Sequence, residues 1–295
     1  MQSALAFGRC RAENRPVEKE RRPWWLYFNL LGLDAPVIAV VWLFLFAQTW
    51  RVNYHPWEAY AALGLSVWAI RIMAKLLSSA MAGDEEAFTM RHRKTLRNVA
   101  VIAGISSLIL TVLNFPLSGY NYFLIGAVLV TAYFALALFS PSDDNEPVYA
   151  KHLMAGGAFA YGTALMAHAY LPSLTIQDMV LSREFICFAV LCLLASSATD
   201  LWTQSGKVED REIKAAHELA LSLPLTLLGA AALVFAVQND SMNTRPFFYG
   251  ILTGAALLQV LNRMRGRFNL GTVKVLTAMC LIAPGMIFEA YALSR

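Results

Sequence analysis

The stretch WEAYAALGLSVWAIRIMAKLLSSAM, residues 57–81, sets the fold class. As an α-helix rising 1.5 Å per residue, it is long enough to cross a hydrocarbon core of about 30 Å. Its second half nevertheless carries Arg71 and Lys75 one helical turn apart, with no acidic residue between positions 69 and 79. Charged side chains inside a membrane are costly, so what these two cations face is the first question that the sequence raises.

The rest of the chain repeats the apolar pattern. Of its 295 residues, 58% are hydrophobic and 15% are charged, which is too apolar for a soluble domain of this size. Further apolar runs lie at 26–49, 97–113, 120–139, 150–171, 184–203, 214–237, 246–262 and 272–292. Together with 57–81 they predict an all-α, polytopic membrane protein with nine transmembrane helices. The runs lack the alternation of a membrane β-barrel.

The basic residues predict the orientation. Most of the 24 Lys and Arg residues lie in the tail before the first run or in alternate connectors, and few lie in the other connectors. The positive-inside rule therefore places the N-terminus in the cytoplasm and, with nine crossings, the C-terminus outside. We expect a basic cytoplasmic tail at 1–22 and a transmembrane domain at 23–295. The tail has no apolar core typical of a signal peptide, which suits a bacterial inner membrane.

Several residue types are most simply explained by packing. Cys187, Cys192 and Cys280 fall in apolar runs without disulfide or metal-site spacing, so we expect small packing residues. The segment MAGGAFAYG, residues 154–162, predicts close helix packing through small residues. The consecutive acids at 84–86 cannot share one helical face and predict a solvated loop.

The histidines give no ligand pattern. His92 and His152 fall in predicted cytoplasmic connectors, where surface positions are expected. His168 and His217 fall near predicted helix ends, where a satisfied polar contact is the simpler interpretation. The basic connectors are explained by the positive-inside rule and need no nucleic-acid partner.

The architecture resembles that of the UbiA-type intramembrane prenyltransferase superfamily. The likeness rests on the predicted helix count and on dense charged connectors after the second and sixth helices. It also rests on RPWWLYFNLLGLDAP (22–36), TMRHRKTLR (89–97) and FSPSDDNEPVYAKHLMAGGAFAYG (139–162). The resemblance implies a nine-helix bundle whose site opens to the cytoplasm. It also implies carboxylates on helices 2 and 6 that hold Mg²⁺ ions bridging to an isoprenoid diphosphate.

This chain departs from the motif of that family. On the second predicted helix, the family's Asn and two Asp positions fall on Ile70, Ala74 and Ser78. On the sixth, the best frame gives Ser196, Asp200 and Gln204. Asp200 is therefore the candidate catalytic residue, and Asp200 with Gln204 is a weak candidate metal site. Mg²⁺ is the expected cofactor only if the protein is catalytic.

Two interpretations of Arg71 and Lys75 stay open. In the first, both point into the bundle and, with Arg91, Arg93 and Lys94, bind an anionic headgroup or a diphosphate directly, replacing the charge of a metal. In the second, both side chains snorkel to the inner headgroups without a ligand. The two interpretations differ in whether the cations meet partners inside the protein.

Three hypotheses for the function follow. The first is a membrane protein with a prenyltransferase-like bundle that binds an isoprenoid or another long-tailed lipid, with lost or weakened Mg²⁺-dependent transfer. The second is an active, divergent prenyltransferase that moves a prenyl chain from a diphosphate to an aromatic or quinone-type acceptor, with Asp200 and Asp210 in a rebuilt metal site. The third is a non-catalytic subunit that packs against other membrane proteins.

Overall fold

A computed structural model describes residues 24–77, 84–116, 119–171 except 140–148, 175–207, 211–238 and 244–293. The predicted tail and Asp210 lie outside these residues. The described residues form helices and short turns without a β-strand. The helices are α1 (Trp24–Leu30), α2 (Asp34–Thr49), α3 (Trp57–Leu77), α4 (Asp84–Arg91), α5 (Arg93–Asn114), α6 (Tyr120–Phe139), α7 (Tyr149–His168), α8 (Ile176–Val180), α9 (Arg183–Lys207), α10 (Arg211–Gln238), α11 (Thr244–Met264), the 3₁₀ turn η2 (Arg265–Arg267) and α12 (Leu270–Leu293).

The all-helical prediction is confirmed for the described residues, and each predicted apolar run is helical over most of its described length. Five of the described helices are long and apolar enough to cross a membrane: α3, α5, α9, α10 and α12. The α1–α2 pair makes a sixth if it is counted as one broken span. Nine crossings stay a prediction. Residues 84–91 form α4, so the expectation of a loop at 84–86 was wrong.

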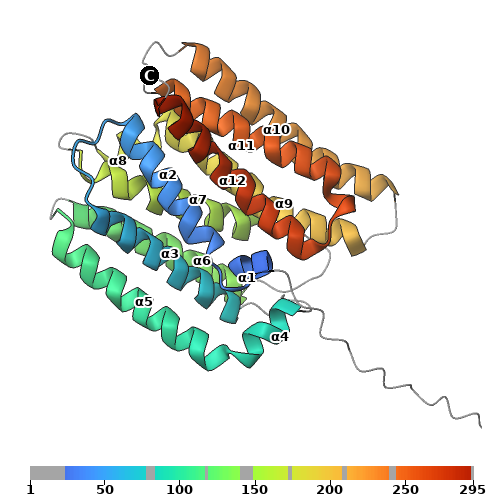
Figure 1. Ribbon diagram of the computed structural model, residues 1–295, viewed down its shortest axis with the longest axis horizontal. Coiled ribbons are helices and arrows are strands. Elements are labelled where there is room, and N and C mark those ends of the chain that lie inside the picture. Colours follow the sequence, from blue (N-terminus) through green and yellow to red (C-terminus); the bar gives the residue numbers. More distant parts are fainter. Residues whose placement is uncertain are drawn as a thin grey trace, which may run out of the picture.

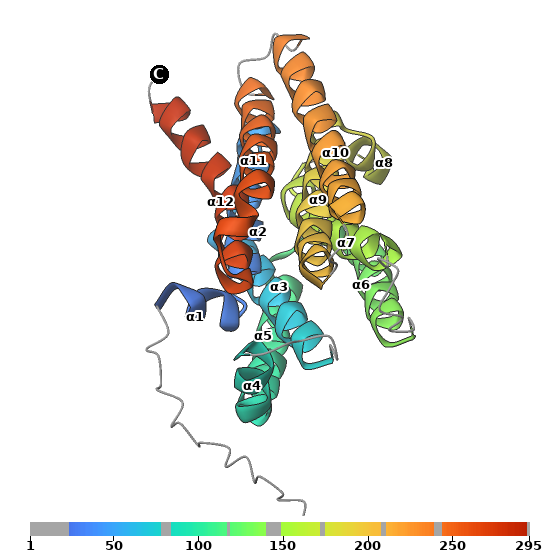
Figure 2. The ribbon, with the colours of Figure 1, turned by 90° about the vertical axis from the view of Figure 1, so that its right-hand side faces the viewer.

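The long helices run alternately in opposite directions and pack beside their neighbours in the chain (Figure 1). Chain-order neighbours pack from α6 through α7, α9, α10 and α11 to α12, and α12 packs against α2. At the other edge, α5 packs on α3 and α3 on α2 (Figure 2). Helix α2 also contacts α7, which places it in the middle of the bundle.

The alternation brings one set of helix ends together. The starts of α2, α5, α7, α10 and α12 meet the ends of α3, α6, α9 and α11. We call this the basic end, because Arg91, Arg93, Lys94, Lys151, Arg263, Arg267 and Lys274 all belong to it. At the opposite end, the ring of Trp50 lies 5.8 Å from that of His168, and Tyr54 lies 6.0 Å from Tyr170.

Aromatic side chains fill the middle of the bundle around α2. Trp42 stacks on Phe188 of α9 with ring centroids 4.5 Å apart, and Phe46 packs against Phe188 and Phe247. The Trp42 indole N–H donates to the carbonyl of Leu281 in α12, at 2.9 Å. This hydrogen bond satisfies the buried indole and fastens α2 to α12. The expected packing role of Cys187, Cys192 and Cys280 is confirmed, since all three are buried free thiols.

Close helix packing at 154–162 is confirmed at one glycine. A Cβ atom at Gly156 would lie 2.8 Å from the backbone of Leu193 in α9, so only glycine allows this approach of α7 to α9. A Cβ atom at Gly157 or Gly162 would meet nothing within 4 Å. The prediction therefore holds for Gly156 and was wrong for the other two glycines.

These neighbouring glycines provide a matched pair of variants. We expect Gly156→Ala to lower the free energy of unfolding by about 1–3 kcal/mol, because the added methyl group must push α7 away from the α9 backbone. Gly157→Ala should leave stability unchanged or raise it by about 0.5–1 kcal/mol, because alanine favours the helix. Unfolding in mixed micelles titrated with SDS measures both. Equal effects of the two substitutions would contradict the close approach at Gly156.

Candidate anion-binding cluster at the basic end

The first predicted run is broken into two helices at the basic end. The axes of α1 and α2 differ in direction by 79°, and the break lies at residues 31–33. Gly32 has a φ of +66°, a left-handed conformation that glycine adopts without strain. A Cβ atom there would also lie 3.2 Å from Cγ of Arg71. The corner thus forms at a glycine and lies directly against α3.

Two side chains of α3 donate hydrogen bonds to backbone carbonyls at the end of α1 and in the corner. The Lys75 ammonium donates to the carbonyl of Asn29 at 2.5 Å and to that of Leu30 at 3.3 Å. The Trp68 indole N–H donates to the carbonyl of Leu31 at 2.8 Å. A cation at a helix C-terminus also interacts favourably with the helix dipole. Lys75 therefore caps α1 and holds it against α3.

Arg71 meets an acid at the start of α2. Its Nη2 atom donates to Oδ2 of Asp34 at 3.3 Å, and the side-chain amide of Asn29 donates to the same oxygen at 3.1 Å. Asp34 is only 7% exposed, whereas the Arg71 side chain is 42% exposed. Asp34 is the first residue of α2, where a carboxylate is favoured by the helix dipole. The pair thus links α2 to α3, and part of the Arg71 side chain remains accessible.

These contacts answer the question of what the two cations face. Lys75 is only 7% exposed and reaches inward to backbone carbonyls, so it does not snorkel to the headgroups. Arg71 is tied to Asp34, a partner that the sequence interpretation missed. The sequence feature that could have revealed this partner is Asp34 in LLGLDAP, residues 30–36, which lies between Gly32 and Pro36. Whether Arg71 and Lys75 also contact an anionic ligand stays a prediction.

The candidate catalytic residue Asp200 is paired with a histidine across α7 and α9. Oδ2 of Asp200 lies 2.7 Å from Nε2 of His152. The His152 side chain is 12% exposed, so the expectation of a surface position was wrong, whereas that of Asp200 is 54% exposed. His152 lies near the start of α7, and α9 ends beside it. The imidazole is therefore covered by the bundle. The Asp200 carboxylate therefore already has a hydrogen-bond partner within the protein.

Basic side chains surround this pair. Lys151 and Lys274 interact electrostatically with Asp200, and the Tyr133 phenol on α6 interacts with both Arg71 and Asp200. The structure thus gathers side chains from α3, α6, α7, α9 and α12 around one region. We define the inner cluster as Arg71, Tyr133, Lys151, His152, Asp200 and Lys274. Arg71 is paired with Asp34, and the three cations of the cluster still outnumber Asp34 and Asp200 together, so the local field favours an anion.

The inner cluster is a poor match to a magnesium site. Mg²⁺ is held by several oxygen ligands in octahedral geometry, usually including one or two carboxylates and substrate phosphates. Here Asp200 is bonded to His152 and lies near Lys151 and Lys274. In the part of the chain that the structure describes, no three His, Cys, Asp or Glu side chains come close enough to hold a metal ion. The side chain of Gln204, the second weak candidate ligand, lies outside the described residues.

The remaining predicted binding residues lie apart from the cluster. Arg91, Arg93 and Lys94 are exposed around the junction of α4 and α5, where Figure 1 shows α4 at the margin of the bundle. Helix α5 packs on α3 through Ala100, Ala103 and Ser107, so its first turn stands away from α7 and α9. A direct role of these cations in the same site stays a prediction.

The two histidines near helix ends behave differently. His217 Nδ1 lies 3.2 Å from the Ser205 hydroxyl, so the expected polar contact is confirmed. His168 is 2% exposed, and neither ring nitrogen has a hydrogen-bond partner among the described residues. Its ring instead packs edge-on to Trp50 and tilted to Tyr122. The expectation of a satisfied contact was therefore wrong for His168.

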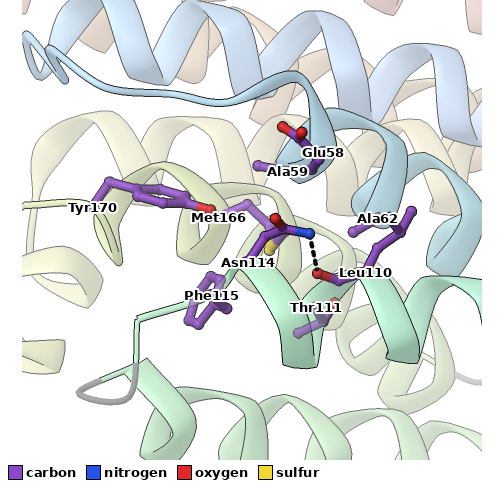
Figure 3. Close-up of a pocket in the computed structure, with 9 residues that line it drawn as sticks. All are labelled: Glu58, Ala59, Ala62, Leu110, Thr111, Asn114, Phe115, Met166 and Tyr170. Carbon is purple, nitrogen blue, oxygen red and sulfur yellow. Dashed lines mark hydrogen bonds between the residues drawn. The ribbon is translucent and has the colours of Figure 1, made fainter.

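A shallow hollow of about 150 Å³ lies at the opposite end, between α3, α5 and α7 (Figure 3). This volume includes open solvent, and the hollow encloses no space of the size of a small-molecule pocket. The Asn114 amide, drawn in Figure 3, is occupied by a hydrogen bond to the Leu110 carbonyl at 3.0 Å. The remaining lining is mostly apolar: Ala59, Ala62, Thr111, Phe115, Met166 and Tyr170, with Glu58 at the rim. The inner cluster is therefore the stronger candidate site.

Comparisons with known proteins give no family assignment. No protein-family model, no curated protein and no solved structure matches this chain.

Proposed function

We propose that this protein is an integral membrane protein that binds a phosphate-headed, long-tailed lipid, of which an isoprenoid is the leading candidate, at its basic end. The observation that carries the proposal is the inner cluster, in which Lys151 and Lys274 interact with a carboxylate already bonded to His152, and Tyr133 interacts with both that carboxylate and Arg71. A phosphate group would add the negative charge that this group of cations favours. The long apolar helices around the cluster provide a membrane setting suited to a lipid tail.

We propose further that the chain forms a nine-crossing bundle of the UbiA-like kind in a bacterial inner membrane. The alternating helices, the packing of α12 against α2, and the charged ends of α3 and α9 support this architecture. The positive-inside rule then assigns the basic end to the cytoplasm and the C-terminus to the outside. In this arrangement, the ends of the second and sixth crossings carry Arg71 and Asp200 into one region.

Such a site is suited to holding a lipid phosphate and poorly suited to cleaving it. Ionisation of an allylic diphosphate is assisted by a metal that neutralises the leaving group. In this region the described residues offer Asp200, which is engaged by His152, and Asp34, which is paired with Arg71, and α3 carries no acid at this end. Lysine and arginine contacts would stabilise the bound phosphate by charge-assisted hydrogen bonds instead.

A transfer assay tests this proposal. Purified protein is incubated with farnesyl diphosphate, Mg²⁺ and an aromatic acceptor, and prenylated product and bound diphosphate are both measured. We expect binding without product, and binding that is unchanged when Mg²⁺ is chelated with EDTA. Prenyl transfer that is abolished by EDTA or by Asp200→Ala would overturn the proposal.

One observation favours an active prenyltransferase as the second candidate. The Asp200 side chain is 54% exposed, so its carboxylate is accessible from the region that the basic side chains surround. In that case His152 would have to release Asp200 to Mg²⁺ when the diphosphate binds. The same assay separates the two functions, because only the enzyme forms product.

Association with other membrane proteins, as expected of a non-catalytic subunit, would appear as stoichiometric co-purification from detergent extracts.

A further inference from the structure

The corner between α1 and α2 turns a short aromatic helix across the end of the bundle. Figure 2 shows α1 lying crosswise to α11 and α12, in keeping with the 79° bend from α2. Three of its seven residues, Trp24, Trp25 and Tyr27, are exposed, and Trp24 is 81% exposed. Such a helix does not continue the span of α2. It presents large amphipathic rings outward at the level of the basic end.

This helix is held firmly in its crosswise position. Lys75 and Trp68 bind the carbonyls at its C-terminal end, as described above. On its other side, Leu26 packs against the first turn of α12, where a Cβ atom at Gly271 would lie 3.2 Å from Leu26. The orientation of the exposed rings is therefore fixed by contacts to both α3 and α12.

The neighbouring turn between α11 and α12 adds positive charge to the same surface. Arg263 in the last turn of α11 and Arg267 at the end of η2 are exposed, and Phe268 and Leu270 are exposed directly after η2. Leu270 adjoins Gly271, the residue that contacts α1. The exposed rings of α1 and the exposed residues of the α11–α12 turn therefore belong to two elements that pack against each other at the basic end.

We propose that this surface, the aromatic–basic lip of Trp24, Trp25, Tyr27, Arg263, Arg267 and Phe268, binds the anionic phospholipids of the leaflet at the basic end. Trp and Tyr rings are favoured at the boundary between headgroups and acyl chains, because one part of each ring system is apolar and another is polar. Arg side chains at the same level bind lipid phosphates by paired, charge-assisted hydrogen bonds. Binding of anionic phospholipid at the lip does not depend on which ligand the inner cluster binds.

Charge complementarity favours a lipid over a protein as the partner. The lip carries two exposed Arg side chains among aromatic groups, and in the orientation proposed above the anionic headgroups of the cytoplasmic leaflet face this end. Each Arg near such a surface contributes about a fivefold gain in affinity for anionic lipid. Zwitterionic phosphatidylcholine offers much less of this attraction.

The full chain in detergent, titrated with phosphatidylglycerol or phosphatidylcholine, tests the charge of the lip. Bound lipid is counted by native mass spectrometry. For Arg263→Gln with Arg267→Gln, we expect phosphatidylglycerol affinity to fall about fivefold for each Arg, with phosphatidylcholine binding unchanged. Arg51→Gln, which removes an exposed cation at the opposite end, is the control and should change neither affinity. An equal loss of phosphatidylglycerol binding in this control would overturn the proposal.

Tryptophan quenching in vesicles tests the position of the lip without relying on the Arg variants. Lipids brominated near the headgroup should quench wild-type fluorescence more than they quench that of the variant carrying Trp24→Phe and Trp25→Phe. The other five tryptophans, among them the buried Trp42 and the exposed Trp57, are present in both proteins and give the same background in each. Equal quenching of wild type and variant would contradict a lipid partner.

Discussion

Replacing Arg71 by Met is expected to lower the free energy of unfolding by about 2 kcal/mol. The substitution leaves Asp34, which is 7% exposed, without its guanidinium partner at the start of α2. Removing one partner of a fully buried ion pair costs about 3–5 kcal/mol. Because the Arg71 side chain is 42% exposed, solvent screening reduces that figure. Unfolding in mixed micelles titrated with SDS measures the change.

A second substitution distinguishes a lost ion pair from lost packing. Adding Asp34→Asn to Arg71→Met removes the uncompensated buried charge and should restore most of the lost stability. Arg93→Gln removes an exposed cation from the start of α5 and should change stability by less than about 0.5 kcal/mol. If the double variant were no more stable than Arg71→Met, the Arg71–Asp34 pair would not account for the effect.

The largest expected change in binding comes from the two lysines of the inner cluster. We expect Lys151→Gln and Lys274→Gln each to weaken the binding of farnesyl phosphate about tenfold, because each removes one charge-assisted contact to the phosphate. The combined variant should show a loss of about a hundredfold if the two contacts act independently. Equilibrium binding of radiolabelled farnesyl phosphate to the purified protein measures the loss.

Two controls tie this loss to the phosphate and to the cluster. Farnesol has the same tail without the phosphate, so its weaker binding should be unaffected by Lys151→Gln and Lys274→Gln. Arg183→Gln removes a cation at the opposite end, where it lies over the ring of Phe235, and should leave farnesyl phosphate binding unchanged. Parallel losses for farnesol and farnesyl phosphate would place the phosphate elsewhere on the protein.

The sequence predicted the helices better than it predicted their contacts. Periodic apolar runs identify buried or lipid-facing helices, and the run at 120–139 coincides with α6. The run at 26–49 concealed the break at Gly32, because its residues remain apolar through the corner. Only Gly32, Asp34 and Pro36 marked that position, and each of them is also found within transmembrane segments.

The partners of the candidate site could not be predicted from spacing alone. Asp34 and Arg71 lie 37 residues apart, and His152 and Asp200 come from α7 and α9. Which side chains meet depends on the rotation of each helix about its axis, which the apolar pattern does not fix when a helix is apolar on all sides. For that reason Asp200 could be identified from the spacing of a motif on one helix, whereas its partner His152, on another helix, was placed at the surface.

The same reasoning explains the glycine and histidine results. Gly156 and Gly157 are indistinguishable in sequence, yet only Gly156 faces the α9 backbone. His168 was expected to have a polar partner, but aromatic rings surround it among the described residues. Which glycine faces α9 and which side chains surround His168 both depend on how each helix is rotated about its axis and on which helices it packs against. These are properties of the packed bundle.

A density map of the full-length protein with farnesyl diphosphate, prepared in the presence of Mg²⁺, tests the central claim most directly. We predict that the diphosphate lies among Arg71, Lys151 and Lys274, with Asp200 still bonded to His152. A diphosphate bridged to the protein through a divalent ion, with three or more acidic side chains as its ligands, would contradict the account.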